Sequence, residues 1–115
     1  MALHYNLAKV YEISEDDTDF VREILKLFVQ EVPVDLLHMK TAINEKNHQE
    51  TYSFAHKIKP SLVLLGMTIA YEENLCVENW TRDKGKKKEI KDTYKSLENH
   101  IEKAVKEIKK DFNLQ

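Results

Sequence analysis

His56 is the side chain of this sequence best suited to do chemistry, because a neutral imidazole is a nucleophile that can hold a phosphoryl group on nitrogen. Lys59 follows one helical turn later, where an ammonium group can meet the negative oxygens of a transferring phosphoryl group. No His, Asp or Glu stands three or four positions from His56, so the spacing does not indicate a metal site. The pair indicates nucleophilic chemistry at His56.

Both residues lie in a segment that the sequence predicts as a helix from Asn47 to Leu65, ending at Gly66. At about 100° per residue, His56 points to solvent, opposite an apolar face made of Phe54, Ile58, Leu62 and Leu65. Four residues lie within about 60° of His56 on the solvent side: Tyr52, Lys59, Pro60 and Val63.

An apolar rim around a reactive polar group is typical of a docking site. A surface histidine beside scattered apolar residues produces the same spacing, and the spacing alone favours this simpler interpretation. The helical period therefore predicts where His56 points but leaves both interpretations open.

Four long helical patterns, with a short one before them, position this segment. Apolar residues recur at three- and four-residue steps over about 17–46, 47–65, 69–81 and 87–111, and a short helix is expected over 6–13. Pro33 stands inside the first long pattern, which continues in phase beyond it, so we expect a kink there. No segment reads as a strand. The prediction is an all-α single domain over 1–115, an antiparallel up-down four-helix bundle with a short extra N-terminal helix.

Two further helices also have predicted buried faces. In the last helix the expected stripe is Ile90, Tyr94, Leu97, Ile101, Ala104 and Ile108. In the helix over 69–81 we expect a cap at Thr68, an inert cysteine and an inward face made of Ile69, Leu75, Cys76 and Trp80.

Composition limits the class of protein. The 115 residues carry a formal net charge of −2, which argues against a globally basic nucleic-acid-binding protein. Two Gly and two Pro are too few for turn-rich sandwiches and barrels or for Gly-rich phosphate loops. With one cysteine, no signal-peptide pattern and no membrane-spanning apolar run, we expect a cytoplasmic protein without a membrane partner.

The segment Ala55-His56-Lys57-Ile58-Lys59-Pro60-Ser61, followed by Gly66, resembles the A-H-x-L-K-G-S signature of histidine-containing phosphotransfer (HPt) domains, whose later glycine follows the histidine by ten residues. The preceding helix, with its proline, and the two helices after Gly66 are also similar to those of the family, so the resemblance covers nearly the whole chain. The fold that the resemblance implies is the four-helix bundle predicted above.

The resemblance implies a monomeric phosphorelay intermediate. Such domains accept a phosphoryl group from a receiver-domain aspartyl phosphate and pass it to another receiver, without kinase activity of their own. By this resemblance His56 is phosphorylated and Lys59 steadies the phosphoryl oxygens. The face around His56, with Tyr52, Pro60 and Val63, is expected to dock the receiver. Phe20 and Leu27 are expected to extend that face, because they lie off the main core stripe of the preceding helix. Response-regulator receiver domains and a hybrid histidine kinase are the implied partners. No cofactor is expected, since Mg²⁺ comes with the receiver.

Pro60 departs from the signature, which has glycine at this position. Proline lacks the amide that would bond the His56 carbonyl, and its ring crowds that carbonyl. The ring is also compact and apolar, so it is a candidate part of the docking surface. A helical adaptor that binds receivers without transferring phosphate is therefore the first alternative function.

Residues 82–91 supply the second alternative. They carry six positive and two negative charges, as a nucleic-acid patch would. No aromatic side chain is interleaved, and a solvated turn explains the segment better. We therefore expect no nucleic-acid partner.

Overall fold

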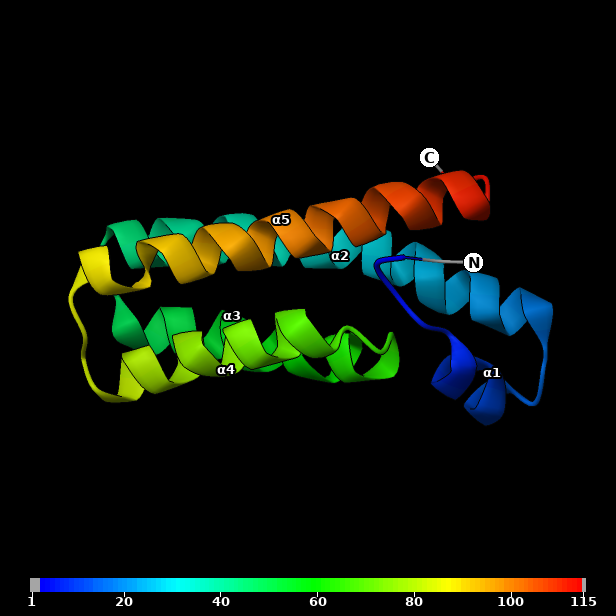
Figure 1. Ribbon diagram of the computed structural model, residues 1–115, viewed down its shortest axis with the longest axis horizontal. Coiled ribbons are helices and arrows are strands. Elements are labelled where there is room, and N and C mark those ends of the chain that lie inside the picture. The colour runs from blue at the N-terminus through cyan, green and yellow to red at the C-terminus, as the bar shows by residue number, and fades with distance from the viewer. Residues whose placement is uncertain (1–2, 115) are drawn as a thin grey trace.

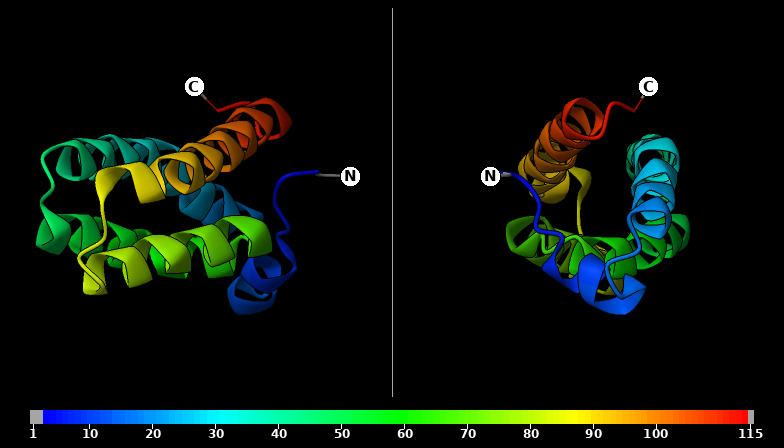
Figure 2. Two further views of the ribbon diagram at one scale, coloured as in Figure 1. Left: turned by 60° about the vertical axis from the view of Figure 1, so that its left-hand side comes forward. Right: turned by 90° about the vertical axis from the view of Figure 1, so that its right-hand side faces the viewer.

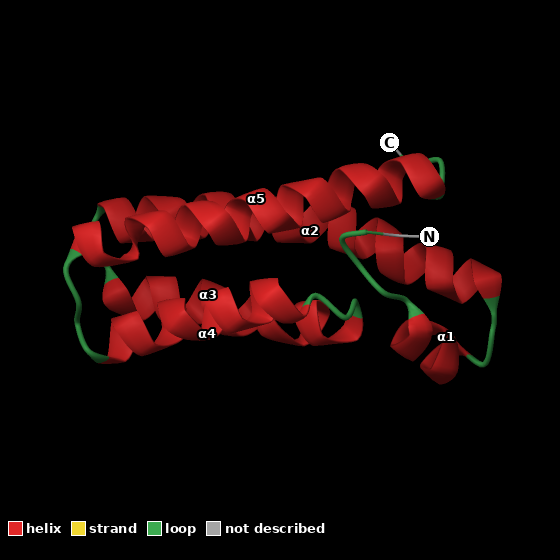
Figure 3. Cartoon of the chain, in the orientation of Figure 1, coloured by secondary structure: helices red, strands yellow, loops and turns green. Residues whose placement is uncertain are grey.

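The computed structural model describes residues 3–114 and contains five helices: α1 (Ala8–Ser14), α2 (Thr18–Asn44), α3 (His48–Leu64), α4 (Thr68–Arg82) and α5 (Lys87–Asp111). Figure 3 shows only helices and connecting loops over these residues, so the all-α class is confirmed. The predicted helix boundaries agree with the observed ones to within two residues, and the described chain measures 44 × 24 × 21 Å.

The four long helices pack in a closed sequence. Helix α2 contacts α3, α3 contacts α4, α4 contacts α5, and α5 returns to contact α2, while α1 packs against α2. Figure 1 shows α2 and α5 in one layer above α3 and α4. The end-on view in Figure 2 places these four helices at the corners of a rough square. Helix α3 contacts both α2 and α4, and its outer face is exposed at His56, Pro60 and Val63.

The ends of α3 confirm the sequence-based prediction. The Asn47 Oδ1 atom accepts a hydrogen bond from the Glu50 amide at 3.0 Å, which caps the first turn. At the other end, Gly66 has φ +60°, and the Met67 amide donates to the Leu62 carbonyl at 2.9 Å. This is the Schellman pattern of a helix C-terminus. A Cβ on Gly66 would lie 2.8 Å from the Asn6 Cβ, so glycine is required by both conformation and space.

The core is formed by the apolar stripes of all four long helices. The largest fully buried apolar side chains are Leu25, Met39, Ile58, Leu62, Leu65, Leu97, Ile101 and Ile108. All six residues of the stripe expected in α5 are buried, so this prediction is confirmed. Helix α2 is continuous from Thr18 to Asn44, so Pro33 does not split it into two helices.

Helix α4 is oriented differently from the prediction. Ile69 is 65% exposed, Cys76 is exposed and Leu75 is half-buried, so only Trp80 of the four expected residues is buried. Thr68 is the first helical residue and Met67 occupies the cap position, without a side-chain hydrogen bond.

The physical reason is that the inward face of α4 carries polar side chains with partners. These are Asn74, Glu78 and Thr81, alongside Ala70 and Val77. Asn74 donates to the Ala55 carbonyl at 2.8 Å, and the Thr81 hydroxyl donates to the Glu78 carbonyl at 2.6 Å. Buried polar groups are tolerated where they are hydrogen-bonded, and a pattern of apolar residues alone does not show them.

Candidate functional site

The centre of the candidate site is a buried carboxylate that the sequence analysis did not single out. Glu78 on α4 is 1% exposed and faces α3. Its Oε1 atom accepts a hydrogen bond from the Lys59 ammonium at 2.9 Å. Its Oε2 atom lies 3.7 Å from His56 Nδ1 and has no hydrogen-bond partner among the described residues. The carboxylate therefore joins the two residues predicted to carry the chemistry.

Lys59 lies nearer the interior than expected. The helical period placed it on the solvent side, but its side chain is only 24% exposed and reaches across to α4. The long aliphatic stem of lysine allows this, because it packs along apolar surface while the head group finds a partner. The hydrogen bond to Glu78 raises the pKa of Lys59 against the opposing effect of burial, so its positive charge is secured.

His56 points outward, as the helical period predicts. Its side chain is 62% exposed, and its ring stacks on Tyr52 with centroids 5.6 Å apart and planes 15° from parallel. The guanidinium of Arg82, at the end of α4, lies 5.6 Å from the centroid of the Tyr52 ring. Tyr52 therefore limits the movement of the imidazole. Arg82, a residue that the sequence analysis did not assign to the site, adds a positive charge beside Tyr52.

Pro60 and Val63 lie on the same outer face of α3. Both side chains are exposed, and α3 continues as a helix through Pro60 to Leu64. By the helical period, both positions lie within about 40° of His56 around the helix. The structure therefore groups Tyr52, Lys59, Pro60 and Val63 with His56 on one surface, here called the His56 face.

The two predicted docking residues on α2 are set apart from this group. Leu27 is 53% exposed and lines the groove between α2 and α3, together with Ser61 and Leu64. Phe20 is 48% exposed and lies 15 residues before Asp35 on α2. That separation is about 22 Å of helix. Asp35 marks the part of α2 beside the His56 region, because its carboxylate accepts a hydrogen bond from Lys57 of α3 at 2.9 Å. Leu27 widens the His56 face on its α2 side, whereas Phe20 lies near the far end of α2.

The sequence carried one signal for the missed residues. Asn74, Glu78 and Thr81 recur at four- and three-residue steps, which is a polar row on one helical face. The partners of Asn74 and Glu78 lie on α3. How close α3 and α4 come to one another cannot be read from the residue pattern of either helix alone. Glu78 could therefore be placed on a face from the sequence, but not opposite His56.

The arrangement can support attack by a ring nitrogen on an electrophile. A carboxylate beside Nδ1 favours a proton on that nitrogen and leaves Nε2, on the other side of the ring, with the free electron pair. Two positive charges contact neighbours of His56: Lys59 pairs with Glu78, and Arg82 lies over the Tyr52 ring. Among the described residues no group of three or more His, Cys, Asp or Glu side chains is arranged to hold a metal ion. Within the same residues, no helix has the length and apolar character needed to cross a membrane.

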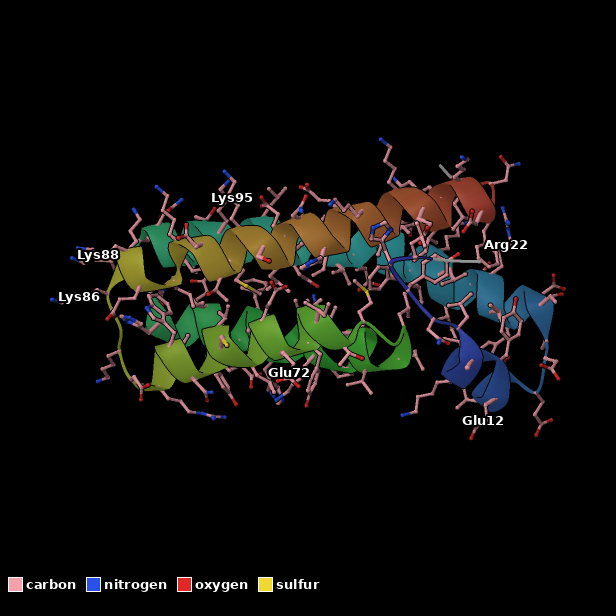
Figure 4. All side chains as sticks on the ribbon, viewed as in Figure 1. Glu12, Arg22, Glu72, Lys86, Lys88 and Lys95 are labelled. Carbon is pink, nitrogen blue, oxygen red and sulfur yellow. The ribbon has the colours of Figure 1, made fainter. Side chains whose placement is uncertain are left out.

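Figure 4 shows charged side chains that project outward from the bundle, among them Glu12 on α1, Arg22 on α2, Glu72 on α4 and Lys95 on α5. Comparisons with known proteins add no family to these observations. No protein-family model, curated protein or solved structure matches the chain.

Proposed function

We propose that this protein is a histidine phosphotransfer domain of a two-component phosphorelay, phosphorylated on His56. The observation that carries the proposal is an outward imidazole whose Nδ1 lies 3.7 Å from the buried Glu78 carboxylate. The match of the surrounding residues to the HPt signature supports it. On this proposal α2–α5 are the antiparallel four-helix bundle of that family, and α1 is the extra N-terminal helix.

The proposed reaction is reversible transfer between an aspartate and a histidine. The Nε2 electron pair of His56 attacks the phosphorus of a receiver's aspartyl phosphate, and the bond from phosphorus to the aspartate oxygen breaks. The receiver carboxylate leaves with the electron pair, and the imidazole ring, still protonated on Nδ1, gains positive charge. Glu78 stabilises that charge as it develops, because its free Oε2 faces Nδ1. Transfer to a second receiver reverses these steps.

Lys59 has two roles in this proposal. Its ammonium group holds Glu78 in position at 2.9 Å and brings positive charge near the oxygens of the phosphoryl group. The protein has no kinase activity on this proposal, and Mg²⁺ arrives with the receiver. The proposed partners are response-regulator receiver domains and a hybrid histidine kinase in the cytoplasm. On this proposal the protein acts as a monomer.

The receiver is proposed to dock on the His56 face. Val63 is 43% exposed and Pro60 is exposed beside it, which gives an apolar rim around the imidazole. Leu27 extends the rim across the groove towards α2, and Tyr52 closes it towards α4. Phe20 takes part only if the receiver covers the length of α2.

The test is phosphoryl transfer from a panel of phosphorylated receiver domains. The labelled product should be acid-labile and alkali-stable, as a phosphoramidate is, and His56→Gln should carry no label. His38→Gln is the matched control, because His38 is another exposed helical histidine. Label on His56→Gln, or none on the parent with any receiver, would refute phosphotransfer; retained receiver binding in the second case would favour the adaptor function.

A second experiment tests the role of Glu78. Glu78→Gln removes the charge while preserving shape, so transfer should slow by about tenfold or more. Nitrogen NMR of the His56 ring should also show a smaller Nδ1-protonated population than in the parent. An unchanged tautomer ratio in a folded Glu78→Gln protein would show that Glu78 does not position the imidazole.

A further inference from the structure

A basic pocket lies between α2 and α5, in the layer opposite the His56 face. Its volume is ≈ 800 Å³, and its lining comes from the C-terminal part of α2, the following turn and the N-terminal half of α5. Ile43 and Tyr94 are buried and form an apolar floor. Since His56 and Glu78 belong to α3 and α4, the pocket is a separate site.

Six exposed lysines surround this floor: Lys40, Lys46, Lys87, Lys88, Lys91 and Lys95. Figure 4 shows Lys95 projecting from α5 on the side away from α3 and α4. Among the described residues none of the six forms an ion pair within 4.0 Å. The acidic residue of the lining is Glu98, whose Oε2 atom lies 3.0 Å from the Tyr94 hydroxyl.

This concentration of positive charge is unfavourable in the free protein. Lys87, Lys91 and Lys95 follow one another at four-residue steps on α5, and like charges at that spacing repel. The positive end of the α5 macrodipole lies beside them. The chain as a whole has a formal net charge of −2, so the lysines are segregated on an otherwise acidic protein. A bound polyanion would relieve the repulsion.

We propose that this lysine-lined pocket binds a compact polyphosphate, either a nucleoside polyphosphate or inorganic polyphosphate. Ammonium groups bind phosphate as point charges, and several of them around one pocket suit several adjacent phosphates. The volume falls in the range of small-molecule sites. Nucleic acid suits the pocket less well. Tyr94, the aromatic residue of the lining, is 6% exposed and its hydroxyl contacts the Leu36 carbonyl at 2.7 Å, so it offers no stacking platform.

The test is isothermal titration of the full chain with sodium tripolyphosphate in 0.15 M salt. A triple variant, Lys87→Gln with Lys91→Gln and Lys95→Gln, should lose at least about tenfold in affinity. The matched control neutralises three exposed lysines outside the pocket, at Lys9, Lys26 and Lys103, and should lose about twofold or less. His56→Gln should bind like the parent, which separates this test from the proposed phosphotransfer.

Titration of the same protein with ATP distinguishes inorganic polyphosphate from a nucleoside polyphosphate as the ligand. Equal affinity for tripolyphosphate and ATP would support recognition of the phosphates alone, whereas tighter binding of ATP would support a nucleoside polyphosphate whose nucleoside makes contacts of its own. Three results would overturn the proposal. They are no heat with either compound at millimolar concentration, equal losses in the two triple variants, and binding of duplex DNA or single-stranded RNA but not of tripolyphosphate.

Discussion

Pro60 imposes a stability cost on α3 that a single substitution should remove. The helix runs from His48 to Leu64 with Pro60 inside it, and a proline there has no amide to donate to the His56 carbonyl. The ring is exposed on the outer face, so removing it gives up little packing. Pro60→Ala should therefore stabilise the protein.

The size of the effect can be bounded. Proline is about 3 kcal/mol less favourable than alanine in a helix interior, which is the upper value. The restored hydrogen bond alone contributes about 1 kcal/mol, which is the lower value. For a chain of 115 residues the unfolding entropy is about 240 cal/mol/K, so each kcal/mol raises the melting temperature by about 4 °C. The expected increase is about 4–12 °C.

The assays are thermal unfolding followed by circular dichroism, which measures the melting temperature, and urea unfolding followed by the fluorescence of Trp80. The urea midpoint should also rise while the denaturant slope stays constant, since the surface exposed on unfolding is unchanged. Pro33→Ala is the comparison, because Pro33 is half-buried and lines the groove between α2 and α5. Its gain should be smaller, since the substitution also removes packing.

A lower midpoint for Pro60→Ala would refute this reasoning. It would mean that the ring makes contacts worth more than the helix penalty. If the midpoint rises as expected, receiver binding becomes the second measurement. The same substitution should weaken binding to the His56 face, because it removes an apolar group next to the imidazole.

Three further predictions concern other parts of the structure. Lys59→Met should destabilise the protein more than Glu78→Gln, because it leaves a buried carboxylate without its cation, and the double variant should recover stability in a double-mutant cycle. Gly66→Ala should lower stability in urea by at least about 1 kcal/mol, since it forces a side chain onto a backbone at φ +60°. The pKa of Glu107 is lowered mainly by the Leu3 amide, so its contribution is complete above its ordinary value of 4.5 and is lost as pH falls through the lowered value. Amide NMR signals of the N-terminal segment should move to disordered positions in acid, and Glu107→Gln should remove this pH dependence.

Most of the fold was predictable because it depends on local periodicity. The apolar stripe of α5, the cap at Asn47 and the end of α3 at Gly66 each follow from residues within one or two turns of each other. The outward direction of His56 was predictable for the same reason. A residue's angle around a helix requires only the helix itself.

The part of the site that could not be predicted depends on contacts between helices. Ile69 and Cys76 were expected inside because they are apolar, but α4 turns Asn74 and Glu78 inward, where α3 supplies partners. Lys59 was placed in solvent because its angle is near that of His56, yet its flexible stem reaches Glu78. Both errors come from judging one helix without its neighbour.

Three departures from local rules meet on the His56 face, and their coincidence is the strongest structural argument for a function there. A proline interrupts the hydrogen bonding of α3, a carboxylate is buried with one oxygen unbonded, and apolar side chains stay exposed around a histidine. Each feature lowers stability or solubility by itself. By contrast, α5 shows an ordinary buried stripe, and α2 begins at a side-chain cap on Asp17. Sequences break local rules mainly where function requires it. If the His56 face were only solvated surface, replacing Pro60, Val63 and Leu27 with helix-forming polar residues would raise stability and cost nothing; on the phosphotransfer proposal the same triple variant keeps the fold and loses receiver-dependent labelling.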